Sequence, residues 1–434
     1  YTLSLHDALP ILRDDRGILN NGRLWLQADD IDVKPWLNKW MQDNVALDSA
    51  RFSLEGWMTL NKGVVESGDV WLKKGGASWQ GDNDTHHLLV DNLTAHVSRQ
   101  QQGWQFDIPT TRITMDGNPW PQGSLAFAWV PAQETGGAND QRSDELRVRA
   151  SRLELNALDG MLPIAEKISP ELGKVWRTMA PAGLLENLAL DIPLQATEKT
   201  RFQARWKNIS WKQWELLPGV ENLSGTLSGS VENGRVTIDM AKAKMPYATV
   251  FRAPLEIDKG VATLAWQNDE RGLQIDGHDI DVQANAIHAR GDFRYLQPEG
   301  DEPWLGILAG INVTDGGQAW RYFPENLMGK ALVDYLSAAI QGGQADNATL
   351  VYGGNPRLFP YKHNEGQFEV LVPLRNATFA FQPDWPALKN FDIQLDFIND
   401  GLWMKTDDVA LGGVKATNLT ADRKSTRLNS SHSS

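Results

Sequence analysis

Period-two alternation of apolar and polar residues is the feature that most constrains this chain. Residues 391–397, with the sequence FDIQLDF, place an apolar side chain at every second position. Successive side chains of a strand point to opposite faces, so this run predicts a strand with one apolar and one solvated face. Similar runs fill most of the sequence, separated by polar or glycine-containing turns. The sequence therefore predicts a mainly β protein built from many amphipathic antiparallel strands.

One order of elements, a helix followed by about five strands, occurs twice. In the second copy the helix is expected from Pro324 to Gln341, closed by Gly342-Gly343. Its strands are expected at residues 348–352, 367–372, 377–381, 391–398 and 402–405, with a hairpin turn at 399–401. The first copy has a helix from Ser169-Pro170 and a strand at 188–192, and its residues 202–211 and 218–223 align with 368–381 and 386–391. Repeats with a fixed internal order are typical of stacked, open-ended architectures.

We divide the chain into three segments on this basis: residues 12–155 as a β-groove segment, 156–323 as the first copy with the strands after it, and 324–422 as the second copy. Alternation from Ala50 to Trp129 predicts a meander with turns at 61–63, 74–76, 81–84 and 116–118. A strand at 23–28 is expected to end at Asp29-Asp30. Residues 299–318, rich in glycine and acid, are expected to be a connection with a small apolar island at 304–308.

Asparagines and paired glycines interrupt the alternating pattern at positions where we expect turns or helix ends. Asn92, Asn208, Asn222 and Asn376 each precede an apolar-small pair, and we expect them at turns just before strands. The glycine pairs are expected at turns or helix ends, because no Lys-Ser/Thr follows them at phosphate-loop spacing. These pairs are 75–76, 342–343, 353–354 and 412–413.

Composition excludes several classes of function. The net charge of −13 argues against a nucleic-acid partner. The absence of cysteine excludes thiol catalysis, cysteine metal sites and disulfides. No run of about 18 apolar residues is present to span a bilayer as a helix, and no signal peptide is visible.

The sequence offers no constellation for catalysis, a cofactor or a metal. His86 and His87 follow Asp84, but adjacent strand residues face opposite ways, so the two imidazoles are poorly placed to share one ion. Acidic residues are frequent, yet most lie at turns or alternate with apolar residues on strands, which is typical of a solvated sheet face. We find no nucleophile elbow and no Ser/His/Asp arrangement. The sequence gives an acid/base hydrolase no particular support.

The apolar strand faces pose a packing problem. There are too few helices to cover them, and 18 tryptophans add large apolar surface, either as core filling or as the lining of a lipid or ligand surface. A single curved sheet would leave an apolar groove that acyl chains must fill, whereas a closed sandwich would bury the faces against each other. The residues alone leave both solutions open.

A family resemblance favours the groove. The motifs that carry it lie at residues 322–330 (YFPENLMGK), 334–343 (DYLSAAIQGG), 358–361 (LFPY), 368–370 (FEV) and 382–386 (QPDWP). They resemble the AsmA-like family of Gram-negative bacteria, and the likeness extends over residues 12–422. Residues 1–11 and 423–434 instead resemble translated adapter sequence and fit no strand pattern.

The resemblance implies a long curved antiparallel sheet that forms an elongated, repeating β-groove with a few short flanking helices. It implies a periplasmic protein that passes phospholipid acyl chains between the inner and outer membranes, without catalysis. The family's N-terminal inner-membrane anchor and its C-terminal remainder are expected to lie outside this fragment, so parts missing here would contact the membranes. The oligomeric state stays open.

Alternation in the second copy selects the candidate lining of the groove. These residues are Phe368, Val370, Val372, Phe379, Phe381, Phe391, Ile393, Leu395 and Phe397. The alternative is a periplasmic or extracellular β-sandwich module that binds protein or glycan and carries no lipid.

Overall fold

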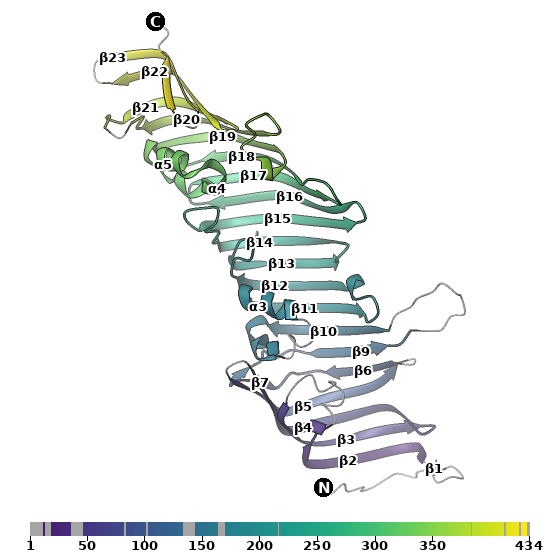
Figure 1. The fold of residues 1–434 in the computed structure, drawn as a ribbon. Coiled ribbons are helices and arrows are strands. Elements are labelled where there is room, and N and C mark those ends of the chain that lie inside the picture. Colours follow the sequence, from purple (N-terminus) through teal and green to yellow (C-terminus); the bar gives the residue numbers. More distant parts are fainter. Residues whose placement is uncertain are drawn as a thin grey trace. The chain divides into compact units, whose positions relative to one another are not determined.

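Antiparallel strands make up most of the chain. The computed structural model describes residues 12–13, 19–35, 47–81, 84–100, 103–132, 144–163, 170–215, 217–382, 384–411, 414–424 and 427–431. The chain divides into two compact units: Tyr1–Trp211 with Thr226–Val231, and Lys212–Gly225 with Glu232–Ser434. In both units long antiparallel strands dominate and the described helices are few and short, which confirms the mainly β fold class (Figure 1). The division into three segments stays a prediction.

The first unit is a meander with one branch. Its strands are β1 (Leu12–Arg13), β2 (Leu19–Asp32), β3 (Leu47–Asn61), β4 (Val64–Gln80), β5 (Thr85–Gln100), β6 (Gly103–Ile108), β7 (Ile113–Met115), β8 (Asn118–Pro119), β9 (Leu125–Val130), β10 (Glu145–Glu154), β11 (Ala182–Pro193) and β12 (Arg201–Trp211). Strands β1 to β6 pair in sequence order, β6 then pairs with β9, and β9 to β12 continue in order. The short β7 branches off β5 and pairs with β8. The helices of this unit whose bounds the structure describes are η1 (Leu155–Met161), α3 (Pro170–Met179) and η2 (Thr197–Lys199).

The second unit pairs each strand with its neighbour in sequence. Its strands are β14 (Asn233–Met245), β15 (Leu255–Asp269), β16 (Gly272–Ala284), β17 (Ile287–Pro298), β18 (Trp304–Val313), β19 (Ile340–Gly354), β20 (Gln367–Phe379), β21 (Leu388–Ile398), β22 (Gly401–Leu411), β23 (Val414–Lys424) and β24 (Arg427–Ser431). All these pairings are antiparallel. The helices are η3 (Gly316–Tyr322), α4 (Glu325–Met328), α5 (Lys330–Ala339) and η4 (Pro356–Leu358). Strand β13 (Val220–Ser230) is divided between the two units.

Bulges inside strands occur where the sequence suggested turns. Asn92, Asn208, Asn222 and Asn376 have left-handed φ of 51°, 50°, 64° and 49° and lie within strands, and the strand pairing shifts register at Asn208 and Asn376. Asp30, with φ of 53°, likewise lies inside β2, which runs on to Asp32 instead of ending at Asp29-Asp30. A bulge inserts one residue into a strand without ending it, and asparagine and aspartate tolerate the left-handed region. The placement of these residues just before strands or at strand ends was therefore wrong.

The paired glycines also lie within strands. Gly75 and Gly76 belong to β4, and a side chain at Gly75 would overlap the ring of Phe52 on β3. Gly342-Gly343 and Gly353-Gly354 belong to β19, where a Cβ on Gly343 would lie 2.7 Å from Cγ of Leu374. All six glycines lie inside strands, and Gly75 and Gly343 permit close approach of the neighbouring strand, so the assignment of these pairs to turns or helix ends was wrong. The fourth pair, 412–413, lies outside the described residues.

Three other expectations are corrected by the second unit. Residues 299–318 are not a connection, because β18 pairs with both β17 and β19. The runs at 367–372 and 377–381 are largely one strand, β20, carried past Asn376 by its bulge. The predicted helix at 324–341 is two helices, α4 and α5, and ends at Ala339. In addition, residues expected to fit no strand pattern form the end of β23 and β24.

The same order of elements occurs in the two predicted copies. Helix α3 with β11 to β14 corresponds to helix α5 with β19 to β22. Backbone details repeat as well, since Gly183 and Gly343 both have positive φ, 116° and 132°. The hairpin predicted at 399–401 joins β21 to β22, with Ile398 paired to Gly401.

Gly329 separates α4 from α5 and provides a direct test of backbone strain. Its φ is +83° and its ψ is 142°, a region that only glycine visits readily, and no atom lies within 4 Å of a Cβ built there. Gly329→Ala should therefore lower the free energy of unfolding by about 1–3 kcal/mol through the backbone alone. Gly310→Ala is the control, because its Cβ also meets nothing within 4 Å but its φ lies outside the left-handed range. Equal urea midpoints for the two variants would contradict this explanation.

Candidate functional site

An apolar row crosses the first unit from strand to strand. Direct cross-strand partners form the series Leu24, Met58, Gly68, Val97, Phe106, Phe127, Val148, Leu190 and Phe202. The row is not covered by other parts of the unit, since Phe106 is 43% and Phe127 37% exposed. Side chains on one face of neighbouring strands touch, so the row is a continuous apolar surface.

The opposite face of the first unit is charged. His96 Nδ1 lies 2.7 Å from Asp69 Oδ1, and Arg149 Nη2 lies 2.6 Å from Asp191 Oδ1. These residues alternate along their strands with members of the apolar row. The unit thus has one apolar and one solvated face, as the period-two pattern predicted.

A second row crosses the other unit. Its members, again direct partners, are Ile280, Gly291, Ala309, Leu350, Val370, Phe397 and Leu402, on β16 to β22. On the opposite face, Asp281 contacts His288 and Arg290 at 2.7 and 2.8 Å. Both units therefore repeat the same division of faces.

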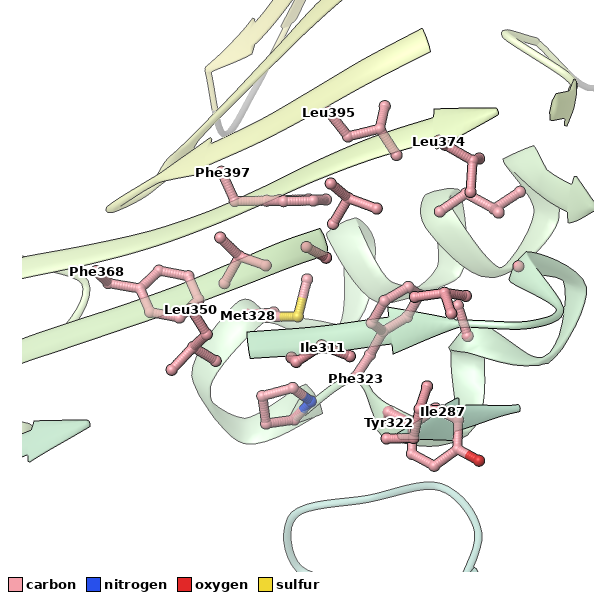
Figure 2. Close-up of a pocket in the computed structure, with 18 residues that line it drawn as sticks. Ile287, Ile311, Tyr322, Phe323, Met328, Leu350, Phe368, Leu374, Leu395 and Phe397 are labelled. Atoms are coloured by element: carbon pink, nitrogen blue, oxygen red, sulfur yellow. The ribbon is translucent and has the colours of Figure 1, made fainter. Parts of the chain in front are cut away.

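A cavity of about 180 Å³ lies against the apolar face of the second unit. Its floor is formed by β17 to β21, and its roof by η3, α4 and the residues that join them (Figure 2). The lining residues are Ile287, Ile311, Val313, Gly316, Ala319, Tyr322, Phe323, Pro324, Met328, Ile340, Ala348, Leu350, Phe368, Val370, Val372, Leu374, Leu395 and Phe397. Tyr322 carries the only side-chain hydroxyl among them, and burial raises the pKa of that hydroxyl. An apolar cavity of roughly 150 Å³ holds a six-carbon ring, so this one suits a short stretch of hydrocarbon.

Comparison of the sequence with known protein families identifies the family of this chain. The family model described as YhdP protein matches residues 11–424. The chain belongs to the YhdP family. This confirms the resemblance carried by the motifs between residues 322 and 386.

One YhdP relative is described as an intermembrane phospholipid transporter, from Escherichia coli strain K12. It is 72% identical over 410 residues, which cover 94% of this chain and 32% of the relative. The chain thus spans about a third of the length of that relative. No solved structure matches the chain.

The candidate lining residues of this YhdP chain divide into two groups. Phe368, Val370, Val372, Leu395 and Phe397 line the cavity. Phe379, Phe381, Phe391 and Ile393 do not, and they pack with Leu336 and Ala339 of α5 in a core cluster that also contains Leu395 and Phe397. Helix α5 packs on this end of β20 and β21, because its Leu336 lies in one buried cluster with Phe379 and Phe391. The role of all nine in lipid binding stays a prediction.

Several cavity residues were missed from the sequence. Ile311 and Val313 lie on β18, and their signal was present as alternation in Leu305, Ile307 and Ala309, within a stretch assigned to a connection. The roof residues Phe323 and Met328 carry no such signal, because their place over the sheet depends on tertiary contacts.

Outside the cavity, the described residues of the YhdP chain form no group that we identify as a candidate catalytic or metal site. His86 Nδ1 lies 2.8 Å from Asp116 Oδ2, and His87 donates its backbone N–H to the same carboxylate, so Asp116 engages both residues. Across the described ranges no three His, Cys, Asp or Glu residues are grouped as metal ligands. None of the helices within those ranges has the length and apolar character needed to cross a membrane.

The β15–β16 hairpin carries a charged pair, Asp269 and Arg271, whose effect on the pKa of Asp269 can be measured. Hydrogen bonds from the side chain and backbone of Arg271 lower the pKa of Asp269 to about 2. Arg271→Ala should raise that pKa toward 3.8, measured by NMR titration of the carboxyl group, whereas Arg290→Ala should leave it unchanged. The pKa of Asp269 is lower in the folded chain than in the unfolded chain, so the ionised carboxyl stabilises the hairpin at pH values above the unfolded pKa, near 3.9. This stabilisation is lost as the pH falls toward 2. A carboxyl that still titrates near 2 in the Arg271 variant would contradict the assignment.

Proposed function

We propose that this chain is a segment of a periplasmic lipid-transfer bridge. Phospholipid acyl chains lie against the apolar rows of the sheet and pass along them between the inner and outer membranes, while the headgroups stay in water. The observation that carries the proposal is the uncovered apolar row of the first unit, with Phe106 and Phe127 more than a third exposed. The name of the Escherichia coli relative supports the choice of phospholipid.

The free energy of burying acyl chains is large enough to hold a phospholipid and uniform enough along a row to let it slide. Each methylene removed from water contributes about 0.8 kcal/mol, so two acyl chains are held firmly. Neighbouring members of a row are about 4.8 Å apart and chemically alike, so successive positions differ little in free energy. Transfer then needs no covalent step, and we assign the chain no catalytic residue and no cofactor.

We extend the proposal to the setting of the bridge. The bridge lies in the periplasm and is tethered to the inner membrane by an N-terminal anchor of the full-length protein. The relative's name as an intermembrane transporter supports the periplasm, and the AsmA-like resemblance supports the anchor.

The closed-sandwich alternative is not favoured. A sandwich buries its inner faces against a second sheet, and inner residues would then be nearly inaccessible. The exposure of Phe106, Phe127 and Trp129 does not fit that arrangement in the first unit.

Lipid content tests the proposal. The 434-residue chain, expressed in the periplasm of a Gram-negative host, should carry phospholipid after mild purification, seen by native mass spectrometry and by extraction. A folded chain with a clean protein mass and no extractable phospholipid would overturn it.

A further inference from the structure

The roof of the cavity is a separate segment, residues 316–328, which we call the strap. It connects β18 to α5 and belongs to no strand. Gly316-Gly317 lies at its start, and Gly329, with φ of +83°, follows its end. Between them Tyr322 lies beside Ile287, and Phe323 and Met328 lie near Ile311 at the cavity (Figure 2). Hinges are often formed by small residues, and glycines bound the strap at both ends.

Polar bonds hold the strap at one place. Arg252, in the loop between β14 and β15, donates from Nε to Glu325 of the strap and from Nη2 to Asp334 Oδ1 of the adjoining helix α5 at 2.6 Å. The backbone N–H of Glu325 also donates to Val250 O at 2.9 Å. The Arg252 side chain is only 27% exposed, so its ion pairs are screened less than those of a fully exposed arginine. We call this set of bonds the latch.

The closed cavity is too small for a passing phospholipid. At about 180 Å³ it accommodates roughly six carbons, less than one acyl chain, whereas a phospholipid carries two. On one side of the strap the apolar row continues to Ile280, and on the other it ends at Leu402, which is buried in the core cluster. The strap therefore covers part of the apolar row of the second unit.

We propose that the strap is a gate on the lipid path, closed by the Arg252 latch over a short stretch of one acyl chain and open when a phospholipid passes. This inference rests on the proposed function. Closure removes the hydrocarbon from water and holds it, while opening breaks the latch and exposes Phe323 and Met328. The rate at which bound phospholipid leaves this unit is then set by the strap rather than by the sheet.

An engineered disulfide tests the gate, because the chain has no cysteine of its own. Val250→Cys with Glu325→Cys places the two thiols where the backbones already share a hydrogen bond. The chain is loaded with labelled phosphatidylethanolamine, and release to phosphatidylglycerol vesicles is followed. We expect the oxidised form to release lipid roughly tenfold more slowly than the same protein after reduction.

A second variant keeps the test independent of the disulfide. Arg252→Ala should release lipid several-fold faster, whereas Arg290→Ala, which removes an ion pair with Asp281 on the opposite face, should match the unaltered chain. Equal release by the oxidised, reduced and Arg252→Ala forms, all carrying lipid, would overturn the gate and leave the proposed function intact. A chain that binds no phospholipid in any form would overturn both.

Discussion

Charging the apolar row of the first unit should remove at least one bound phospholipid per chain. The variant combines Phe106→Arg, Phe127→Asp and Val148→Arg, whose positions are direct partners across β6, β9 and β10. Opposite charges alternate across the strands, so the pairing itself is preserved. A charge facing hydrocarbon costs about 2–4 kcal/mol, which corresponds to a roughly 30- to 700-fold loss of local affinity. Native mass spectrometry counts the lipids, and circular dichroism checks the fold.

The matched control is Trp71→Arg on the solvated face. Trp71 is 40% exposed, close to the value for Phe106, so loss of an exposed aromatic ring is common to both variants. Its partner across β3 is Glu55, and it alternates with Val70, which lies on the apolar side. The control should keep its lipid count. Loss of lipid in both variants, or in neither, would contradict the assignment of faces.

The second large effect is expected on stability, from Phe379→Ala. Phe379 is fully buried on β20 and lies in one cluster with Leu336 of α5 and with Phe391. Truncating a buried phenylalanine costs about 3–5 kcal/mol, because burial is lost and a cavity remains. Urea denaturation should show a loss of this size in the unfolding of the second unit.

Leu308→Ala is the control for Phe379→Ala. Leu308 lies on β18 and is 64% exposed, so its truncation should change the free energy of unfolding by no more than about 0.5 kcal/mol. A similar loss in both variants would show that α5 and β20 do not form the core described above. Because Leu395 and Phe397 are buried in the same cluster, a charge at either position should also destabilise the fold.

The faces of the strands could be predicted from the sequence, but their lengths could not. Alternation is local, so Phe391 and Ile393 share a face whatever surrounds them. The meaning of an asparagine is not local. Asn376 and Asn399 have nearly the same φ, 49° and 50°, yet the first makes a bulge inside β20 and the second a turn between β21 and β22. Only the neighbouring strand, which pairs past a bulge and stops at a turn, distinguishes them.

The candidate site was accessible from the sequence only in part. Val370 and Phe379 lie in two similar alternating runs, but helix α5 packs at the Phe379 end of β20 and leaves Val370 on the cavity. The latch joins Arg252 to Glu325, 73 residues apart. No spacing rule connects such residues, so the roof and its gate follow only from the folded chain.

Site-specific photo-crosslinking to phospholipid tests the central claim most directly. A benzoylphenylalanine replaces Phe127, in the apolar row of the first unit, or Phe293, two residues from Gly291 on the apolar face of the second unit, or Trp71 or Trp403, on the opposite faces. All four native residues are aromatic, so the probe is a comparable change at each. We expect phospholipid adducts at Phe127 and Phe293 and none at Trp71 and Trp403. Adducts of equal yield on both faces, or none at any of the four positions, would contradict an acyl-chain path along the apolar side of the sheet.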